Sequence, residues 1–343
     1  MKKMYKKILV GVVACFSCGY AAAQSAVTIY GVLDQFAEYS DTGAHSTARL
    51  ASSGLYGSRW GLKGSEDLGG GLKANFVLES GINPNTGTFA DSTRAFNRQA
   101  WVSLSQTNVG ELRLGRQTSP MFFTEGQIDA FVGASIASGL NNFSTYTVRT
   151  DNTVAYLSPN FGGVTAEVYY GFGTTGNGLA GANASYQAAL RYINGPLYLA
   201  TIYEAVKNAT NTDILRSTYT GGHYSFNSFI AYLAFHTAKL GSQQIDRQVV
   251  SASVKWLASP FTSLSLGYTY ARDRSGLGNN AQDVGVLYQY ALSKRTTLYA
   301  AASFLDNKEK ANYTLAGAAV AGIPLSSPGE NARGVQLGIV HFF

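Results

Sequence analysis

Few residues in this sequence have the types and spacing that catalysis requires. The four histidines, His45, His223, His236 and His341, are far apart along the chain, and no metal-ligand spacing joins them. A hydrolase or protease would need a nucleophile or an activated water beside a histidine base, and the sequence offers no consistent cluster of this kind. We therefore expect no enzyme, no bound metal and no other cofactor.

Charged residues at alternate positions indicate a different kind of chemistry. If residues 58–66 form a strand, Arg59 and Lys63 share one face with Gly61, whereas Trp60 and Leu62 take the other. Such a segment fits a wall between water and an apolar phase. Fixed charges that line a narrow aqueous gap orient and filter solutes by charge, so these cations are candidates for a pore rather than for an active site.

The composition excludes an ordinary soluble enzyme. Only 13% of the 343 residues are charged and 38 are glycine, whereas soluble domains carry about 25% charged residues and about 7% glycine. The same low charge argues against long disordered regions. Beyond the first residues, no apolar run approaches the ~20 residues that a spanning helix needs, so a helical membrane protein is excluded as well.

Residues 1–23 have the features of an export signal. Four lysines precede an apolar stretch, and the alanines at 21–23 supply a small-residue cleavage site. A lipoprotein cleavage site before Cys15 is the alternative. Cleavage after Ala23 would remove both cysteines and lower the net charge from +6 to +2. The basic character of the full chain therefore gives no reason to expect a nucleic acid partner.

Period-2 alternation recurs in segments of about ten residues over the remaining chain, residues 24–343. Seven short connections alternate with eight long ones, near 40–57, 81–95, 117–151, 171–184, 205–216, 237–247, 271–282 and 305–332, and they separate sixteen strands. We therefore predict an all-β fold, a 16-stranded antiparallel transmembrane β-barrel. A closed sheet pairs every backbone group in hydrocarbon, and about sixteen strands leave a water-filled bore.

Several motifs resemble the general porins of Gram-negative bacteria of the betaproteobacterial type. They are Ser58 to Lys73, Phe96 to Trp101, Leu114 to Gln117 and the terminal Gly338 to Phe343. The resemblance covers the mature chain from Val27 and implies a homotrimer of barrels in the outer membrane, in contact with its lipid and lipopolysaccharide. Each barrel would hold a passive pore for small hydrophilic solutes and inorganic ions, narrowed by an inward-folded third long loop.

The resemblance also implies a ladder of basic residues on the wall opposite that loop. By motif position these residues are Arg59, Arg98 and Arg149. Alternation independently places Arg59 and Lys63 on an inward face. For Arg98, alternation agrees only if Trp101 faces lipid, because the residues at every second position after Arg98 are apolar.

The longest connection, between Gln117 and Thr153, has the length of a functional loop. Its large apolar residues at 121–123, 131 and 143 are candidates to anchor it against the barrel wall. Its only acids before Arg149 are Glu125 and Asp129. Because two loop acids would oppose three arginines and a lysine across the constriction, we predict a mild anion preference.

Two further features qualify this interpretation. Asp34 and Glu38 lie on the face of Thr28 in the first strand and would add negative charge to the lumen. The terminal Phe343 ends a strand with apolar residues at alternate positions, which in this family is the signal that barrel-insertion machinery recognises. The alternative to a pore is an outer-membrane barrel that acts as an adhesin or binding protein through its long loops, with an occluded bore.

Overall fold

The computed structural model describes residues 26–43, 45–173 and 181–343, so the predicted export signal at 1–23 lies outside the described part of the chain. The elements, in chain order, are β1 (Ala26–Asp41), β2 (Ser46–Ser52), β3 (Arg59–Gly69), β4 (Leu72–Asn83), β5 (Thr88–Phe89), β6 (Gln99–Gln106), β7 (Gly110–Thr118), α1 (Pro120–Glu125), α2 (Gly139–Phe143), β8 (Arg149–Leu157), β9 (Val164–Gly171), β10 (Ser185–Asn194), β11 (Leu197–Lys207), β12 (Ile214–Phe226), β13 (Phe229–Leu240), the 3₁₀ turn η1 (Gly241–Gln243), β14 (Ile245–Leu257), β15 (Thr262–Asp273), β16 (Ala281–Ala291), β17 (Thr296–Asn307) and β18 (Ala332–Phe342).

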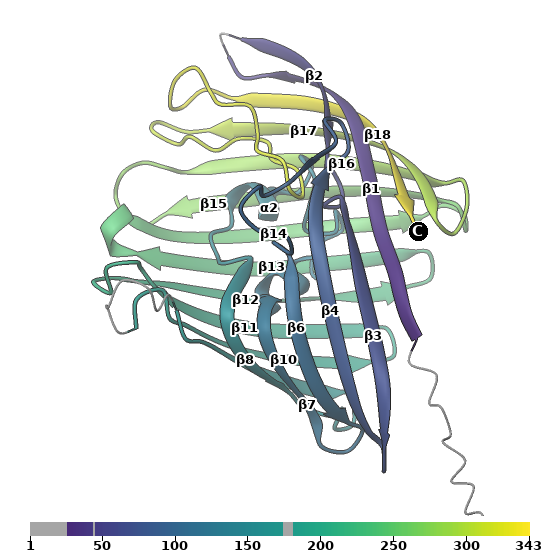
Figure 1. Cartoon of the computed structure of the whole chain (residues 1–343). Coiled ribbons are helices and arrows are strands. Elements are labelled where there is room, and N and C mark those ends of the chain that lie inside the picture. Colours follow the sequence, from purple (N-terminus) through teal and green to yellow (C-terminus); the bar gives the residue numbers. More distant parts are fainter. Residues whose placement is uncertain (1–25, 44, 174–180) are drawn as a thin grey trace, which may run out of the picture.

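The strands close into one antiparallel barrel, which is the predicted fold class (Figure 1). β1 pairs with the last strand, β18, from Val32↔Phe342 to Asp41↔Arg333. On its other side β1 pairs with β2 through residues 35–41 and with β3 through residues 26–32, so these two strands share one position in the wall. β5 only extends the end of β4 as a two-residue hairpin. The eighteen strands therefore occupy sixteen positions, as predicted.

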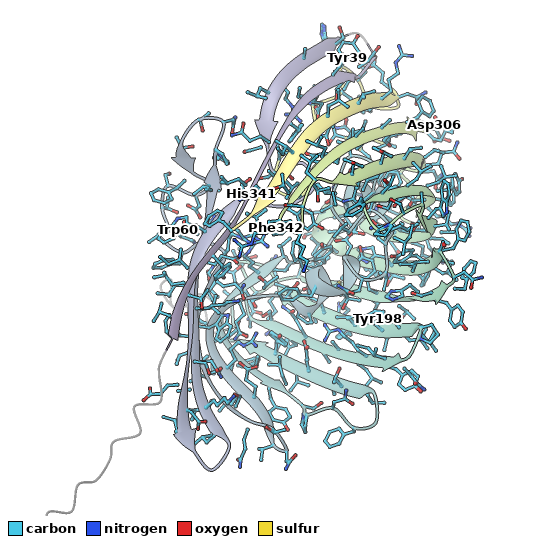
Figure 2. The ribbon with its side chains drawn as sticks, turned by 90° about the vertical axis from the view of Figure 1, so that its right-hand side faces the viewer. Tyr39, Trp60, Tyr198, Asp306, His341 and Phe342 are labelled. Atoms are coloured by element: carbon cyan, nitrogen blue, oxygen red, sulfur yellow. The ribbon has the colours of Figure 1, made fainter. Side chains whose placement is uncertain are left out.

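Side chains alternate between the outer surface and the lumen along each strand. In β18, Val335, Leu337 and Ile339 are exposed on the outside, whereas Gln336 and Val340, on the opposite face, are buried. Figure 2 shows His341 and Phe342 side by side at the end of this strand. His341 is exposed, and Phe342 packs edge-on against Tyr56 with ring centroids 5.3 Å apart. Exposed apolar side chains outside a closed sheet are the arrangement that a lipid bilayer stabilises.

The long connections differ in extent from the prediction. The predicted loop at 40–57 contains a strand, β2. The predicted loop at 237–247 is reduced to the turn around η1, because β13 continues to Leu240 and β14 begins at Ile245. Alternation continues through these segments, since Thr237 and Gln248 still pair across the two strands. Their polar residues indicate a strand that extends beyond the membrane rather than a loop.

The third long loop, residues 119–148 and called L3 below, folds into the barrel, and Figure 1 shows α2 enclosed by the strands. Ser119 and Ser138 cap its two short helices by accepting from Phe122 N and Asn141 N. Among the described residues no helix combines the length and apolar character needed to cross a membrane. Of the predicted anchors, Met121, Phe131 and Phe143 are buried, whereas Phe123 is 49% exposed.

Glycine permits the close approach of L3 to the wall. A Cβ on Gly285 in β16 would lie 1.9 Å from the Ala137 carbonyl oxygen, and a Cβ on Gly267 in β15 would lie 2.5 Å from the Phe131 ring. Both contacts are far shorter than van der Waals distance, so only a residue without a side chain fits. Part of the high glycine content therefore serves loop docking in addition to tight turns.

We expect Gly285→Ala to push L3 away from β16 and to destabilise the barrel by about 1–3 kcal/mol through overpacking. The measurement is the temperature at which the purified protein loses its folded migration in SDS gels. Gly241→Ala is the matched control, because a Cβ there would meet only the Asp213 carboxylate at 3.6 Å. Equal unfolding temperatures for the two variants would contradict the proposed close packing.

Candidate pore constriction

A short inward turn between β2 and β3 places the first predicted arginine. Residues 53–58 leave the wall, and the Asp34 carboxylate accepts from Leu55 N and Tyr56 N, each at 2.6 Å, and from the Tyr299 hydroxyl at 2.9 Å. Asp34 is completely buried. Its position on the lumen side of β1 is the one that alternation predicts, but its carboxylate is taken up in holding this turn.

Arg59 follows the turn directly and meets a carboxylate that the sequence analysis did not select. Its Nε lies 3.3 Å from Glu79 Oε2, and Arg98 Nε lies 2.7 Å from Glu79 Oε1. The Tyr30 hydroxyl also donates to Glu79, at 3.0 Å. Glu79 is only 4% exposed. A buried charge of this kind persists only when it is paired and hydrogen-bonded, and the two arginines satisfy that need.

Arg98 reaches the cluster by a different route from the one predicted. The condition that Trp101 faces lipid is wrong. Trp101 lies on the lumen side, where the Arg113 guanidinium stacks 4.0 Å from its ring centroid, and Val102 is exposed on the outside. Arg98 still points to Glu79 because it precedes β6, which begins at Gln99. Strand alternation does not govern a residue outside the strand.

Arg149 and Lys63 complete the basic set. The Arg149 guanidinium lies 5.8 Å from the Phe122 ring centroid of L3 and feels the charges of Arg98, Glu79 and Arg59. Its Nε is buried without a hydrogen-bond partner among the described residues. Lys63 is exposed further along β3, with Nζ 5.2 Å from the Tyr30 ring centroid. Arg59 and Arg98 thus pair with a single carboxylate, Glu79, and Arg149 lies near enough to feel these charges. The four side chains carry a net charge of +2.

The two loop acids do not face these arginines. Glu125 accepts hydrogen bonds from the hydroxyls of Tyr146 and Tyr219, and Asp129 Oδ2 accepts from Ser138 Oγ at 2.7 Å. Both carboxyl groups are almost fully buried between L3 and the wall. Burial raises the pKa of Glu125 to about 8 and that of Asp129 to about 6, because removing a carboxylate from water disfavours its charged form.

Glu38, the other predicted lumen acid, is also occupied. Its carboxylate lies 2.9 Å from Arg49 Nη2 and accepts from Gln336 Nε2 at 2.6 Å and from Ser40 Oγ at 3.0 Å. It is 4% exposed. Glu38 therefore joins β1 to β2 and β18 instead of presenting a free charge to the lumen.

Strand alternation is a sequence signal that could have identified Glu79. Glu79 shares a face of β4 with Asn75, and Asn75 donates to Ser103 and Ser105 of β6 at 3.2 and 3.0 Å. A carboxylate at an alternate position from such a polar residue is a lumen candidate by the same rule that selected Arg59.

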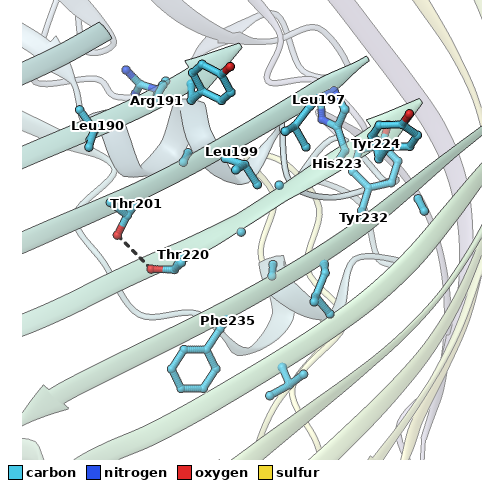
Figure 3. Close-up of a pocket in the computed structure, with 18 of the residues that line it drawn as sticks. Leu190, Arg191, Leu197, Leu199, Thr201, Thr220, His223, Tyr224, Tyr232 and Phe235 are labelled. Carbon is cyan, nitrogen blue, oxygen red and sulfur yellow. Dashed lines mark hydrogen bonds between the residues drawn. The ribbon is translucent and has the colours of Figure 1, made fainter. Parts of the chain in front are cut away.

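A large hollow lies elsewhere, on the outside of the barrel (Figure 3). Its volume is about 810 Å³, and Leu199, Leu233 and Phe235 contribute to its apolar lining. Thr201 and Thr220 satisfy each other there with a 2.9 Å hydrogen bond. The hollow belongs to the lipid-facing wall, and it contributes no group to the constriction. Within the described chain, no group of three or more His, Cys, Asp or Glu residues could hold a metal ion.

The Phe343 carboxyl-terminal residue closes the barrel seam. Its N–H donates to the Gly31 carbonyl oxygen and its carbonyl oxygen accepts from Gly31 N, both at 3.1 Å. A Cβ on Gly31 would lie 2.2 Å from the Phe343 ring, so the ring covers this glycine. The terminal residue is thus part of the pairing between the last strand and the first.

A closed sixteen-position barrel with an inward loop and a basic cluster is the architecture of a porin. Residues 11–310 match the model of the Gram-negative porin family, and the chain belongs to this family. It is therefore an outer-membrane channel protein of a Gram-negative bacterium and not an enzyme.

Individual relatives agree with this assignment. Outer membrane porin protein 32 of Delftia acidovorans is 32% identical over 98% of this chain and all of the relative. The structure described as an anion-selective porin from Comamonas acidovorans matches with a TM-score of 0.81 and 29% identity, over 93% of this chain and all of that one. The trimer form of OmpT from Vibrio cholerae shares the fold, with a TM-score of 0.71 and 15% identity over 93% of this chain and 99% of that one.

Because burial raises the pKa of Glu125, we predict that L3 docks less stably as the pH rises. Its pKa is 4.5 when exposed and about 8 in the folded protein, so between these values the folded state binds more protons than the unfolded state. Stability is then lost as the pH rises from about 4.5 to about 8 and changes no further above that range. We expect Glu125→Gln to flatten this slope in SDS-gel unfolding temperatures measured from pH 5 to 9.

Glu66→Gln, at an exposed carboxylate near the β3–β4 turn, is the control and should keep the wild-type slope. If Glu125→Gln and wild type depend on pH equally, the protonated anchor is not the cause of the dependence.

Proposed function

We propose that this porin is a general diffusion channel for small hydrophilic solutes and ions, with a mild preference for anions. The observation that carries the proposal is the Arg59–Glu79–Arg98 cluster with Arg149 beside it. Two guanidinium groups share one carboxylate, a third lies close enough to feel its charge, and arginine keeps its charge at any physiological pH. A surplus of fixed positive charge in a narrow passage attracts anions and repels cations.

The placement of the acids supports the same conclusion. Glu125, Asp129, Asp34 and Glu38 are each buried in hydrogen bonds that fasten a loop or a strand. They do not offset the arginines across the gap. A solved relative described as an anion-selective porin adds weight to this proposal.

Assembly and export belong to the same proposal. We infer a homotrimer in contact with outer-membrane lipid and lipopolysaccharide, and the trimer form of a solved barrel of this fold supports that inference. We infer that residues 1–23 direct export and are removed, and that Phe343 is the residue that barrel-insertion machinery recognises. The exposed ring of Phe343, 43% accessible at the seam, is available for such recognition.

Reconstitution in planar bilayers tests the channel itself. We expect stepwise conductance in groups of three from the detergent-purified protein, and a reversal potential in a KCl gradient that indicates chloride preference. No conductance would support the alternative of an adhesin with an occluded bore, and a clear cation preference would refute the role assigned to the arginines.

Substitutions that remove one charge at a time test the role of the arginine cluster. Replacing one of the arginines, as in Arg59→Gln, removes a fixed positive charge from the gap, so the anion-to-cation permeability ratio should fall about threefold. Lys73→Gln, at an exposed lysine near the short turn, is the control and should have a smaller effect. The readout is the reversal potential at low salt, where screening is weakest.

Glu79→Gln should shift selectivity in the opposite direction. It removes the carboxylate that pairs with Arg59 and Arg98, so anion preference should increase by a similar factor. The loss of the pairing leaves like charges close together, which should also lower the unfolding temperature in SDS gels. An unchanged or reduced anion preference in a folded Glu79→Gln protein would show that Glu79 does not set the field of the pore.

A further inference from the structure

A tightly held turn directly precedes the arginine cluster in the chain. It comprises residues 53–58, between β2 and β3, and is called the inner turn below. Ser53 begins the inner turn with a φ of 70°, in the left-handed region that residues other than glycine rarely adopt. Such a conformation persists only where the surrounding structure holds it, and it is common at functional sites. The contacts of the inner turn therefore indicate its role.

Asp34 of β1 holds the inner turn at its beginning, middle and end. Its carbonyl oxygen accepts from Ser53 N at 2.9 Å and from Ser58 Oγ at 3.1 Å. Its side-chain Oδ2 accepts from Leu55 N and Tyr56 N, each at 2.6 Å. Leu55 is completely buried, and a buried N–H without an acceptor is costly. The carboxylate therefore removes the main obstacle to folding this segment inward.

The β17–β18 connection holds the inner turn from a second direction. Ala318 N donates to the Gly54 carbonyl oxygen at 3.1 Å. The same connection is tied to L3, because Asn141 Nδ2 donates to the Ala316 carbonyl oxygen at 2.8 Å. Figure 1 shows part of this connection, in yellow, reaching inward toward α2. The inner turn is thus fastened to the barrel wall and, through the β17–β18 connection, to the constriction loop.

One glycine of the inner turn contacts both guanidinium groups that pair with Glu79. Arg59 Nη1 donates to the Gly57 carbonyl oxygen at 2.8 Å. Arg98 lies against the same glycine, since a Cβ on Gly57 would be 2.9 Å from Arg98 Nη1. Arg98 precedes β6, so strand geometry does not fix its side chain. The inner turn and Glu79 together determine where the two guanidinium groups lie.

We propose that Asp34 is a positioning residue for ion selectivity, because it fixes the inner turn and thereby the guanidinium groups of Arg59 and Arg98. This role rests on the anion preference proposed above. By its charge alone, an acid on the lumen side of the wall would weaken an anion preference. Through the inner turn Asp34 strengthens that preference instead, because the field that a solute meets falls with its distance from the guanidinium groups.

Two substitutions of Asp34 that leave no carboxylate separate positioning from charge. Asp34→Ala leaves two N–H groups of the inner turn without their acceptor, so the arginines shift and the anion-to-cation permeability ratio should fall about threefold. Asp34→Asn keeps a carbonyl oxygen that can accept from both N–H groups, so it should keep most of the wild-type ratio. The readout is the reversal potential in a KCl gradient at low salt, for proteins that keep their folded migration in SDS gels.

Gly57→Ala tests the same contact without changing any charge. The added methyl group displaces the Arg98 guanidinium, which is the end of a flexible side chain, so the fold should persist while the permeability ratio falls. Glu38→Ala is the matched control. It removes a buried acid from the same face of β1 whose carboxylate bonds to Arg49 and Gln336, so the ratio should stay unchanged or rise.

The outcomes separate this role from the proposed channel. If folded Asp34→Ala keeps or increases the anion preference of an anion-selective wild type, the positioning role is wrong while the proposed pore remains valid. An equal fall in Asp34→Ala and Asp34→Asn also contradicts the role, because the retained acceptor then makes no difference. If Asp34→Ala does not fold, Gly57→Ala decides, and an unchanged ratio there overturns the proposal. A wild type without conductance or anion preference refutes the proposed function, and the role of Asp34 falls with it.

Discussion

The docking of L3 against the wall formed by β11–β16 is the contact on which the pore depends. A segment of thirty residues inside a barrel must satisfy its backbone polar groups without a sheet of its own. The wall supplies the partners: Glu204 accepts from Thr147 N at 2.8 Å, His236 from Thr145 N at 3.1 Å, and Ser253 from Ala130 N at 3.1 Å. These contacts fix the loop, and the loop leaves the remaining passage to the opposite wall.

The two walls therefore use their charged residues in opposite ways. On the docking side the acids are buried and hydrogen-bonded to hydroxyls and amides. Asp283, for example, accepts from Asn142 Nδ2 and from Ser303 Oγ, each at 2.9 Å. On the side of β3 and β4 the arginines stay charged around Glu79. Acids hold the structure together and bases create the field, so the selectivity of the pore depends on where the acids are placed as much as on where the arginines are.

The barrel could be predicted because its signals are local and repeated. Strand alternation, short turns between long loops and the terminal Phe343 each follow from neighbouring residues, and the strand count survives even where β2 interrupts a predicted loop. The position of Arg59 could be predicted for the same reason. Glu79 obeys the same rule, but its position in β4 shows no motif or neighbouring charge that would distinguish it before the fold brings Arg59 and Arg98 to it.

The partners of Arg98, Glu125 and Asp129 could not be derived from local patterns. Arg98 lies one residue outside β6, where alternation no longer applies. The orientation of the loop acids depends on contacts with residues far away in sequence, such as Tyr219 for Glu125. Only the folded position of L3 decides whether those acids face the lumen or the wall.

The net charge of +2 left after the expected removal of residues 1–23 is a poor guide to the field inside the barrel. Many charges cancel in local pairs, such as Arg191 with Glu167 and Arg113 with Glu111. Other charged groups form hydrogen bonds that hold loops in place, as Asp34 and Asp129 do. A solute in the passage responds to the charges that remain unpaired near its path, and close pairs contribute little beyond a few ångströms. In the pore that we propose, a nearly balanced chain can thus carry a positive constriction, because the acids are hydrogen-bonded within loops and strands while Arg59 and Arg149 stay partly exposed beside Glu79.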